Sequence, residues 1–264
     1  LVFALDRSTR YLPMGALFDG DQYLIERYTI STVLSANLTN LSDRLPAGAQ
    51  NTPILALGAS EFTPEFNPLP NVPKELDAIV RAPQNDTQGI YPGLKFLNQA
   101  FNLPALQANL PGRKILHIAT HAAFVSGRPE ESYLMLGNGK KMSTDEIKTL
   151  TRLGDVHLVV LSACETALGG PDQDGIEISG ISSYFLNAGA KAVVASLWSV
   201  DDASTSLLMQ EFYRVLANST TESPVTKAEA LRQAQLNLLR AKTSEVDFSH
   251  PYFWAPFILI GNGL

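Results

Sequence analysis

Two side chains of this 264-residue chain could together carry out nucleophilic chemistry: its only cysteine, Cys164, and His121. Each follows an apolar run, Cys164 after VHLVVLSA and His121 after KILHIAT. Ligands and reactive groups gather beyond the carboxyl ends of parallel strands, so we expect the thiol and the imidazole to meet there. A neighbouring histidine lowers the pKa of a thiol and delivers the proton to the leaving group. The pair predicts a cysteine nucleophile with a histidine base.

The same residue types also fit plainer roles. A free cysteine is most often a buried apolar filler. Two of the other three histidines, His117 and His157, fall inside predicted strands and fit satisfied core positions, and His250 precedes a proline in a turn. From these residues alone, a cysteine hydrolase and a small-ligand α/β domain both stay open.

The apolar runs before these residues belong to a set of four that are typical of strands buried on both faces. They cover residues 52–59, 114–120, 156–163 and 191–198. Segments with helical spacing alternate with them, at 71–82, 142–150, 175–190, 202–218 and 226–241. This alternation predicts an α/β fold with a doubly wound, mostly parallel sheet flanked by helices. The 43 positions from His121 to Cys164 leave room for one crossover helix between neighbouring strands.

Several local signals place the ends of these elements. Ser143 with Glu146 predicts a capping box, Thr226 opens the last helix, and Gly189 predicts a left-handed helix end. The final apolar run, 252–261, predicts one more strand. Three short segments in the first 32 residues predict a small β-rich lead-in. The Pro-rich stretch 61–73 predicts a surface loop.

Composition narrows the function classes. The chain has 20 Lys and Arg against 26 Asp and Glu, a net charge of −6 and no basic run, which argues against nucleic acid or an anionic membrane as partner. No apolar stretch approaches the roughly 20 residues of a membrane span. One cysteine excludes an internal disulfide and a Cys-rich metal site, so we expect a reducing, cytoplasmic setting.

Several ordered motifs carry a family resemblance. They are ILHIATHAAF, LVVLSACETALGG, AGAKAVVASLWSVDDASTSLLMQEFY, ALRQAQLNLL and HPYFWAPFILIGN. Together they resemble the CHAT peptidase family, caspase-like domains often fused to tetratricopeptide repeats, in the clan of caspases, gingipains and separase. The resemblance implies a caspase-like fold and a dyad of His121 and Cys164, with His117 structural. It implies one domain over 1–264, with the lead-in at 1–50 and the catalytic core at 51–264, excised from a longer chain with an upstream sensor or repeat region.

The resemblance also implies an oxyanion hole made of the backbone amides of Ala122 and Cys164. Relatives commonly carry glycine after the histidine, whereas this chain carries Ala122. An alanine amide can donate without strain only if its φ is negative.

Substrate recognition follows from the same likeness. SLWSVDDAST is similar to a separase stretch in which an aspartate receives a basic P1 side chain, and the matching position is Asp202. Asp202 also has the residue type of a helix N-cap, and Asp201 could exchange roles with it. Ser162 is expected to line the same pocket. The backbone from Ser196 to Trp198 is expected to bind an extended substrate by strand addition.

These observations predict a cytoplasmic cysteine endopeptidase that cleaves protein or peptide substrates after a basic P1 residue, through a thioester acyl-enzyme. We expect regulation by the upstream region and by the loop 169–180, and neither a metal nor an organic cofactor. No D-x-D-x-D-G loop supports calcium binding. One alternative is a non-enzymatic CHAT-like scaffold that binds partner proteins. The other is a small-molecule α/β hydrolase, which the lack of a G-x-S-x-G elbow disfavours.

Overall fold

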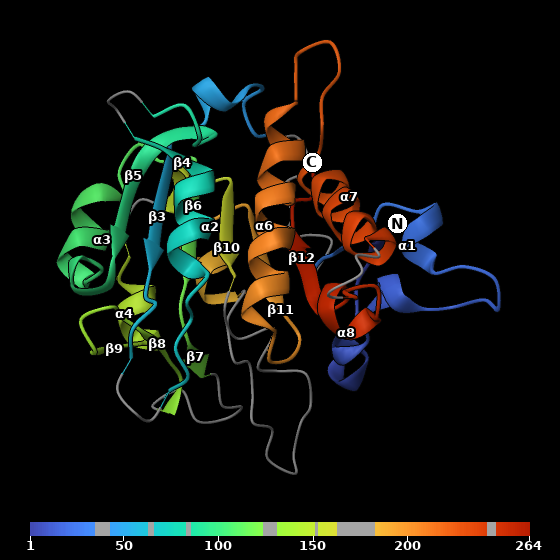
Figure 1. The fold of residues 1–264 in the computed structure, drawn as a ribbon, viewed down its shortest axis with the longest axis horizontal. Helices are drawn as coiled ribbons and strands as arrows, with labels where there is room; N and C mark the ends of the chain where they lie inside the picture. The colour runs from blue at the N-terminus through green and yellow to red at the C-terminus, as the bar shows by residue number, and fades with distance from the viewer. Residues whose placement is uncertain are drawn as a thin grey trace.

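A nine-stranded sheet forms the centre of the molecule (Figure 1). The computed structural model describes residues 1–34, 43–62, 66–82, 86–123, 131–150, 153–162, 183–241 and 247–264. In spatial order the strands are β1 (Val2–Phe3), β2 (Ser31–Thr32), β12 (Phe257–Gly261), β11 (Ala192–Ser196), β10 (Leu158–Leu161), β6 (Ile115–Ala119), β3 (Ile54–Gly58), β5 (Tyr91–Leu97) and β4 (Val80–Arg81).

The four predicted buried strands are β3, β6, β10 and β11, and every residue in them is buried. Parallel pairing joins β3 to β6, β6 to β10, and β10 to β11, while β12 runs antiparallel to β11. The mostly parallel α/β sheet is therefore confirmed. Continuous apolar runs fit it because helices cover both faces and leave no solvated side for polar residues.

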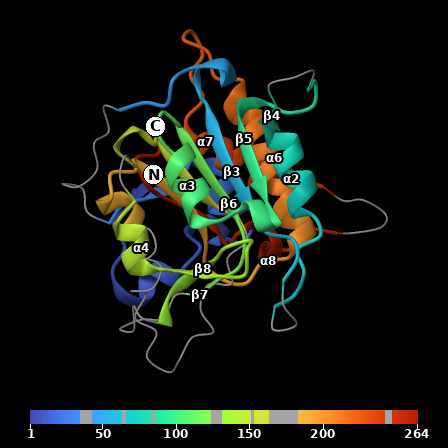
Figure 2. The same ribbon diagram turned by 90° about the vertical axis from the view of Figure 1, so that its left-hand side faces the viewer.

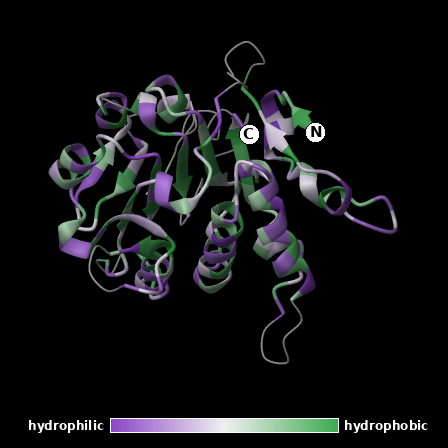
Figure 3. Ribbon diagram, turned by 90° about the horizontal axis from the view of Figure 1, so that it is seen from above, coloured by the Kyte–Doolittle hydropathy of each residue, from purple (hydrophilic) through white to green (hydrophobic). Residues whose placement is uncertain are grey.

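One face of the sheet carries α2 (Val72–Ile79), α6 (Asp202–Ala217) and α7 (Lys227–Arg240). The other face carries α3 (Leu103–Asn109) and α4 (Thr144–Lys148). Figure 2 shows α3 on one side of the strands and α2 and α6 on the other. Figure 3 shows the strands as a hydrophobic layer between helices of mixed character. Each face builds its own core cluster, since neighbouring residues of a strand point to opposite sides.

A second, three-stranded sheet follows β6 directly. It contains β7 (Ala122–Ala123), β8 (Tyr133–Met135) and β9 (Lys141–Ser143), all antiparallel. In Figure 1 it lies near the lower ends of the main strands, where α2 and α6 also begin. At the end of β9, the Ser143 and Glu146 side chains form the predicted capping box and start α4. Thr226 likewise caps α7, and Gly189 has a φ of 114° at its helix end.

Two predictions of extended structure are wrong. The run 252–261 begins with the helical turn α8 (Pro251–Trp254), because His250 caps it and a proline at the first helical position favours a helix start; only its second half is β12. In the lead-in, the segments after β1 are helical turns: η1 (Arg7–Tyr11), η2 (Met14–Ala16) and α1 (Leu24–Arg27). Side chains of Asp6 and Glu26 bond nearby backbone amides at two of these turns, a local gain that outweighs β propensity.

Candidate active site

The predicted site lies at the carboxyl ends of β6 and β10. Their parallel register joins residues 43 positions apart, from Leu158 with Ile115 to Leu161 with Ile118. His121 follows β6 by two residues, and Cys164 is also 43 positions from His121. Cys164 itself and the predicted loop 169–180 lie outside the described residues.

His121 is held on three sides and is only 4% exposed. Its Nε2 atom lies 2.7 Å from the backbone oxygen of Asn67. A carbonyl only accepts, so Nε2 carries a proton, and Nδ1 is the free acceptor of the neutral ring. The ring of Phe66 stacks on the imidazole at 5.4 Å between centroids, and the ring of Phe62 meets it edge-on at 4.5 Å. These contacts fix both the ring plane and the tautomer.

The segment that supplies Asn67 belongs to the stretch predicted as a surface loop. Between Phe66 and Asn71 its sequence is Asn-Pro-Leu-Pro, and each proline fixes its own φ and favours extended backbone before it. Leu69 is buried and its amide donates to the Ser60 carbonyl at 3.1 Å. Sequence reasoning missed this role, because a backbone carbonyl leaves no mark in residue type. The available signal was a proline-stiffened link at the edge of the sheet where reactive groups gather.

Ala122 has the backbone geometry that its predicted role needs. The Met135 amide donates to the His121 carbonyl at 2.9 Å, which makes Ala122 and Leu134 a non-hydrogen-bonded pair of the β7–β8 ladder. The N–H of Ala122 therefore points away from β8. Among the described non-glycine residues only Arg7 and Asn98 have positive φ, so Ala122 carries no left-handed strain.

His117 lies within β6, four residues before His121, and is completely buried. Its Nδ1 is 3.1 Å from the hydroxyl of Tyr213, and its Nε2 is 2.9 Å from Glu75 Oε1. The contact between Glu75 and His117 is a close electrostatic one without hydrogen-bond geometry. Burial raises the pKa of Tyr213 well above its usual value, which keeps its hydroxyl protonated. His117 therefore has the surroundings of a structural histidine.

Ser162 joins this buried group. Its hydroxyl lies 3.3 Å from His117 Nε2, and its amide donates to the Ile118 carbonyl at 3.0 Å. Ser162 is fully buried, two positions before Cys164 in the sequence. These contacts attach the end of β10 to β6.

The two aspartates before α6 have different partners. Asp201 is the N-cap, and its carboxylate accepts from the Ser204 amide at 2.8 Å. Asp202 is the first helical residue, so its alternative role as N-cap is wrong. Its Oδ2 accepts from both the backbone amide and the side-chain amide of Asn71, each at 2.8 Å. The Asp202 carboxylate thus joins the start of α6 to the start of α2.

The remaining predicted substrate contacts lie after β11. Ser196 ends that strand, is fully buried and pairs with Phe257 of β12. The next amide, of Leu197, donates to the Pro256 carbonyl at 2.9 Å. Trp198 is half-buried, and its indole N–H donates to the Tyr252 carbonyl at 3.1 Å. Trp198 packs against the core cluster of the α2 and α6 face.

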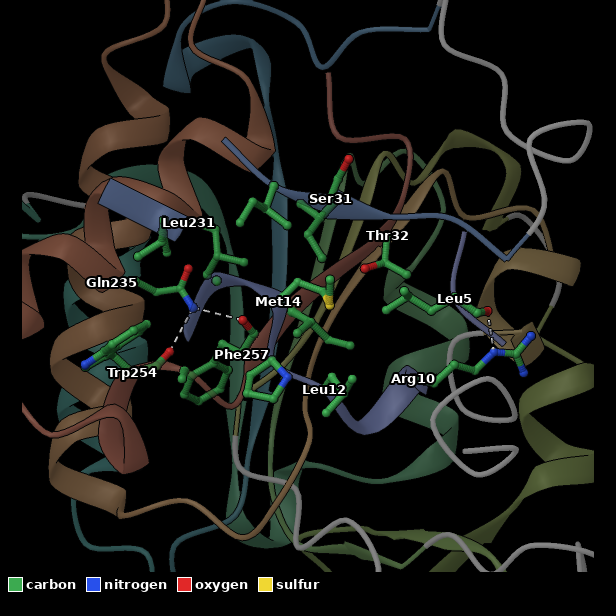
Figure 4. A pocket seen from close by; sticks show the side chains of 17 residues that line it. Leu5, Arg10, Leu12, Met14, Ser31, Thr32, Leu231, Gln235, Trp254 and Phe257 are labelled. Atoms are coloured by element: carbon green, nitrogen blue, oxygen red, sulfur yellow. Dashed lines mark hydrogen bonds between the residues drawn. The ribbon is translucent and has the colours of Figure 1, made fainter. Parts of the chain in front are cut away.

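A small cavity of about 30 Å³ lies elsewhere, between the lead-in and the layer of β12, α7 and α8 (Figure 4). It contains none of the predicted site residues, and Gln235 beside it donates to the carbonyls of Trp254 and Phe257. Among the described residues no group of three or more His, Cys, Asp or Glu could hold a metal ion. None of the described helices is both long and apolar enough to cross a membrane.

Two solved structures share this fold. One is separase of Saccharomyces cerevisiae in its complex with securin, with a TM-score of 0.61, 14% identity, and coverage of 96% of this chain and 15% of that one. The other is the Arg-specific cysteine proteinase gingipain R, with a TM-score of 0.57, 12% identity, and coverage of 94% and 57%. At these identities the likeness establishes the caspase-like fold of these cysteine proteases.

Curated relatives match a shorter stretch. Tetratricopeptide repeat protein 28 of Mus musculus is 36% identical over 107 residues, and the Homo sapiens protein is 35% identical over the same length. The match covers 40% of this chain but only 4% of either relative. The CHAT domain family matches residues 1–262, almost the whole chain. The chain therefore belongs to the CHAT domain family.

Proposed function

We propose that this domain is a cysteine endopeptidase in which Cys164 is the nucleophile and His121 the base. The observation that carries the proposal is the register of β6 and β10. The offset between paired residues of these strands is 43, the same as the sequence separation of His121 and Cys164, which supports placing the two residues near each other. Neighbouring strands lie about 4.8 Å apart, which brings a thiol and an imidazole within reach of each other.

The fixed tautomer of His121 supports the same assignment. Because Nε2 donates to the Asn67 carbonyl, Nδ1 is the nitrogen left to accept the thiol proton. The thiolate of Cys164 then attacks the scissile carbonyl carbon, and protonated His121 gives its proton to the leaving amine. Water hydrolyses the resulting thioester and releases the acid product. The chemistry needs no metal or organic cofactor.

An oxyanion hole follows from the backbone. The Ala122 N–H points away from its ladder partner and is free of left-handed strain, as a donor to a developing oxyanion must be. The backbone amide of Cys164 is the proposed second donor. Each such donor contributes about 10²-fold or more to the rate in comparable enzymes.

We assign substrate recognition to Asp202, Ser162, Ser196 and Trp198. Oδ2 of Asp202 accepts both bonds from Asn71, and within the described part of the chain no hydrogen bond reaches its Oδ1. A carboxylate oxygen with spare acceptor capacity suits the guanidinium or ammonium of a basic P1 side chain. The Arg specificity named for gingipain R, which has the same fold, agrees with this preference.

The wider setting is also part of the proposal. The domain spans 1–264, with the lead-in at 1–50 and the catalytic core at 51–264, and works in the cytoplasm on protein substrates. The curated relatives are named for tetratricopeptide repeats, which supports an upstream repeat or sensor region that regulates the site. The same names favour the alternative of a binding scaffold, in which the domain holds partner proteins without cleaving them.

Labelling of the single thiol separates these functions. We expect iodoacetamide to label Cys164 at pH 7 about tenfold faster in the wild type than in the His121→Ala variant, because the imidazole raises the thiolate fraction. Mass spectrometry after timed quenching measures the rate, and Cys164→Ala provides the unlabelled control. Equal rates in the wild type and His121→Ala would refute the dyad and leave the scaffold as the better function.

A fluorogenic peptide panel tests the P1 preference. We expect cleavage after Arg and Lys, with kcat/KM about 100-fold lower in Asp202→Asn for these peptides and less than about threefold lower for a Leu peptide. Equal wild-type cleavage after Arg, Asp and Leu would remove Asp202 from the pocket.

A further inference from the structure

We propose that Asn71 and Asp202 form a clasp that positions His121, in addition to any contact of Asp202 with substrate. The inference rests on the proposed role of His121 as the base. It is based on the two hydrogen bonds that Oδ2 of Asp202 accepts, both of which come from Asn71, a residue 131 positions away in the sequence.

Asn71 occupies the N-cap position of α2 but does not cap it. Asparagine at this position usually bonds the first turn of its own helix, a contact that stabilises the helix by about 1 kcal/mol. Here its side-chain amide turns to Asp202 instead, and its backbone amide donates to the same oxygen. Because the Asn71 side chain makes no capping bond to α2, we infer that its role is to connect the start of α2 to the start of α6.

The Asp202 end of the clasp is rigid. Asp201 caps α6 through the Ser204 amide, and the 16-residue helix buries Leu208, Met209 and Phe212 against the sheet. Exposed loop segments are normally the mobile parts of a fold. The clasp therefore ties a loop to one of the best-anchored helices of the domain.

The loop passes this restraint to the histidine. It is fixed at Asn71 by the clasp, at Leu69 by burial and the bond to Ser60, and at Asn67 by the bond to His121. Pro68 and Pro70 stand between these points and remove much of the remaining backbone freedom. We infer that this stiff segment passes a displacement at Asn71 on to the Asn67 carbonyl and the Phe66 ring, which hold the imidazole.

The clasp predicts a defect that a P1 contact alone cannot cause. If the segment relaxes, His121 loses its fixed tautomer and ring plane, so the thiolate fraction of Cys164 falls whatever substrate is offered. In Asn71→Asp, which keeps the Asp202 carboxylate, the loss should appear in kcat equally for peptides with Arg and with Leu at P1. A pure specificity contact would change the Arg peptide alone.

A charge exchange across the clasp tests this directly with iodoacetamide, a reagent that has no P1 group. Asn71→Asp places two carboxylates together, and we expect it to label Cys164 about tenfold more slowly at pH 7, with the midpoint of the pH–rate profile moved upward. Asp202→Asn keeps one acceptor for the Asn71 amide and should slow labelling about threefold. The double variant restores a donor and an acceptor, so its rate should recover to that of Asp202→Asn.

Two controls make the outcomes separable. Asn102→Asp makes the same substitution at the N-cap of α3, away from the site, and should leave the labelling rate unchanged. Thermal unfolding of each variant gives the folded fraction. If Asn71→Asp labels at the wild-type rate, or if the double variant stays as slow as Asn71→Asp, the clasp is refuted while the dyad stands. If the wild type labels no faster than His121→Ala, the proposed function fails instead.

Discussion

His117 and His121 lie four positions apart in one segment and are almost equally buried, yet their surroundings differ in kind. Three side chains, from α2, α6 and the end of β10, surround both nitrogens of His117. His121 has one nitrogen on a backbone carbonyl and two aromatic rings around it. No hydrogen bond from the described residues reaches its Nδ1. Burial therefore does not distinguish the two histidines, whereas the hydrogen-bond partners of their ring nitrogens do.

The largest expected effect tests the proposed role of His121 as the catalytic base. His121→Ala should lower kcat/KM for peptide cleavage by about 10³-fold, since general acid–base catalysis contributes between about 10² and 10⁴. Its free energy of unfolding should fall by about 2 kcal/mol, because the variant loses a buried ring between Phe62 and Phe66 and leaves the Asn67 carbonyl without its donor. Peptide hydrolysis and urea unfolding measure the two quantities. A large loss of stability with cleavage intact would reverse the roles of the two histidines.

The structural role of His117 is tested by removing its neighbour Glu75. Glu75→Ala should lower the free energy of unfolding by about 3 kcal/mol, because it leaves His117 without its buried carboxylate. Urea unfolding measures the loss, and Glu75→Gln, which keeps the shape of the side chain, provides the matched control and should cost less. The folded fraction should still label Cys164 at nearly the wild-type rate. A variant as stable as the wild type would show that the buried group adds nothing to the fold.

The smallest effect concerns a third histidine, His157, directly before β10. Burial lowers its pKa below the usual 6.5, while the nearby Asp43 carboxylate partly opposes the shift. The unfolded chain therefore binds the proton near pH 6.5, and the folded chain only at lower pH. Stability from this group is complete above pH 6.5 and declines as the pH falls toward the folded-state pKa.

Urea unfolding between pH 7 and pH 5.5 measures this decline. His157→Gln should flatten it, and Asp43→Asn should steepen it, because the carboxylate no longer favours the charged ring. An identical slope in all three proteins would assign the pH dependence to other groups.

The sequence predicted the parts that depend on local pattern. Continuous apolar runs gave β3, β6, β10 and β11, and residue types at helix starts gave the caps at Ser143 and Thr226. The 43-residue spacing of His121 and Cys164 agrees with the observed register of their strands. Local patterns failed where a cap competes with β propensity, as at His250 before α8.

The sequence by itself determined the order of strands and helices, and it places a histidine and the single cysteine shortly after two apolar runs, because hydrophobic periodicity and capping act over a few residues. Only the tertiary structure decided which partner each polar side chain takes. The Asn67 carbonyl reaches His121 across 54 positions, and Asn71 reaches Asp202 across 131. Such bonds depend on how helices pack against the sheet, which no local spacing encodes. For that reason the sequence suggested a candidate pair, His121 and Cys164, but not the contacts that hold His121 in place.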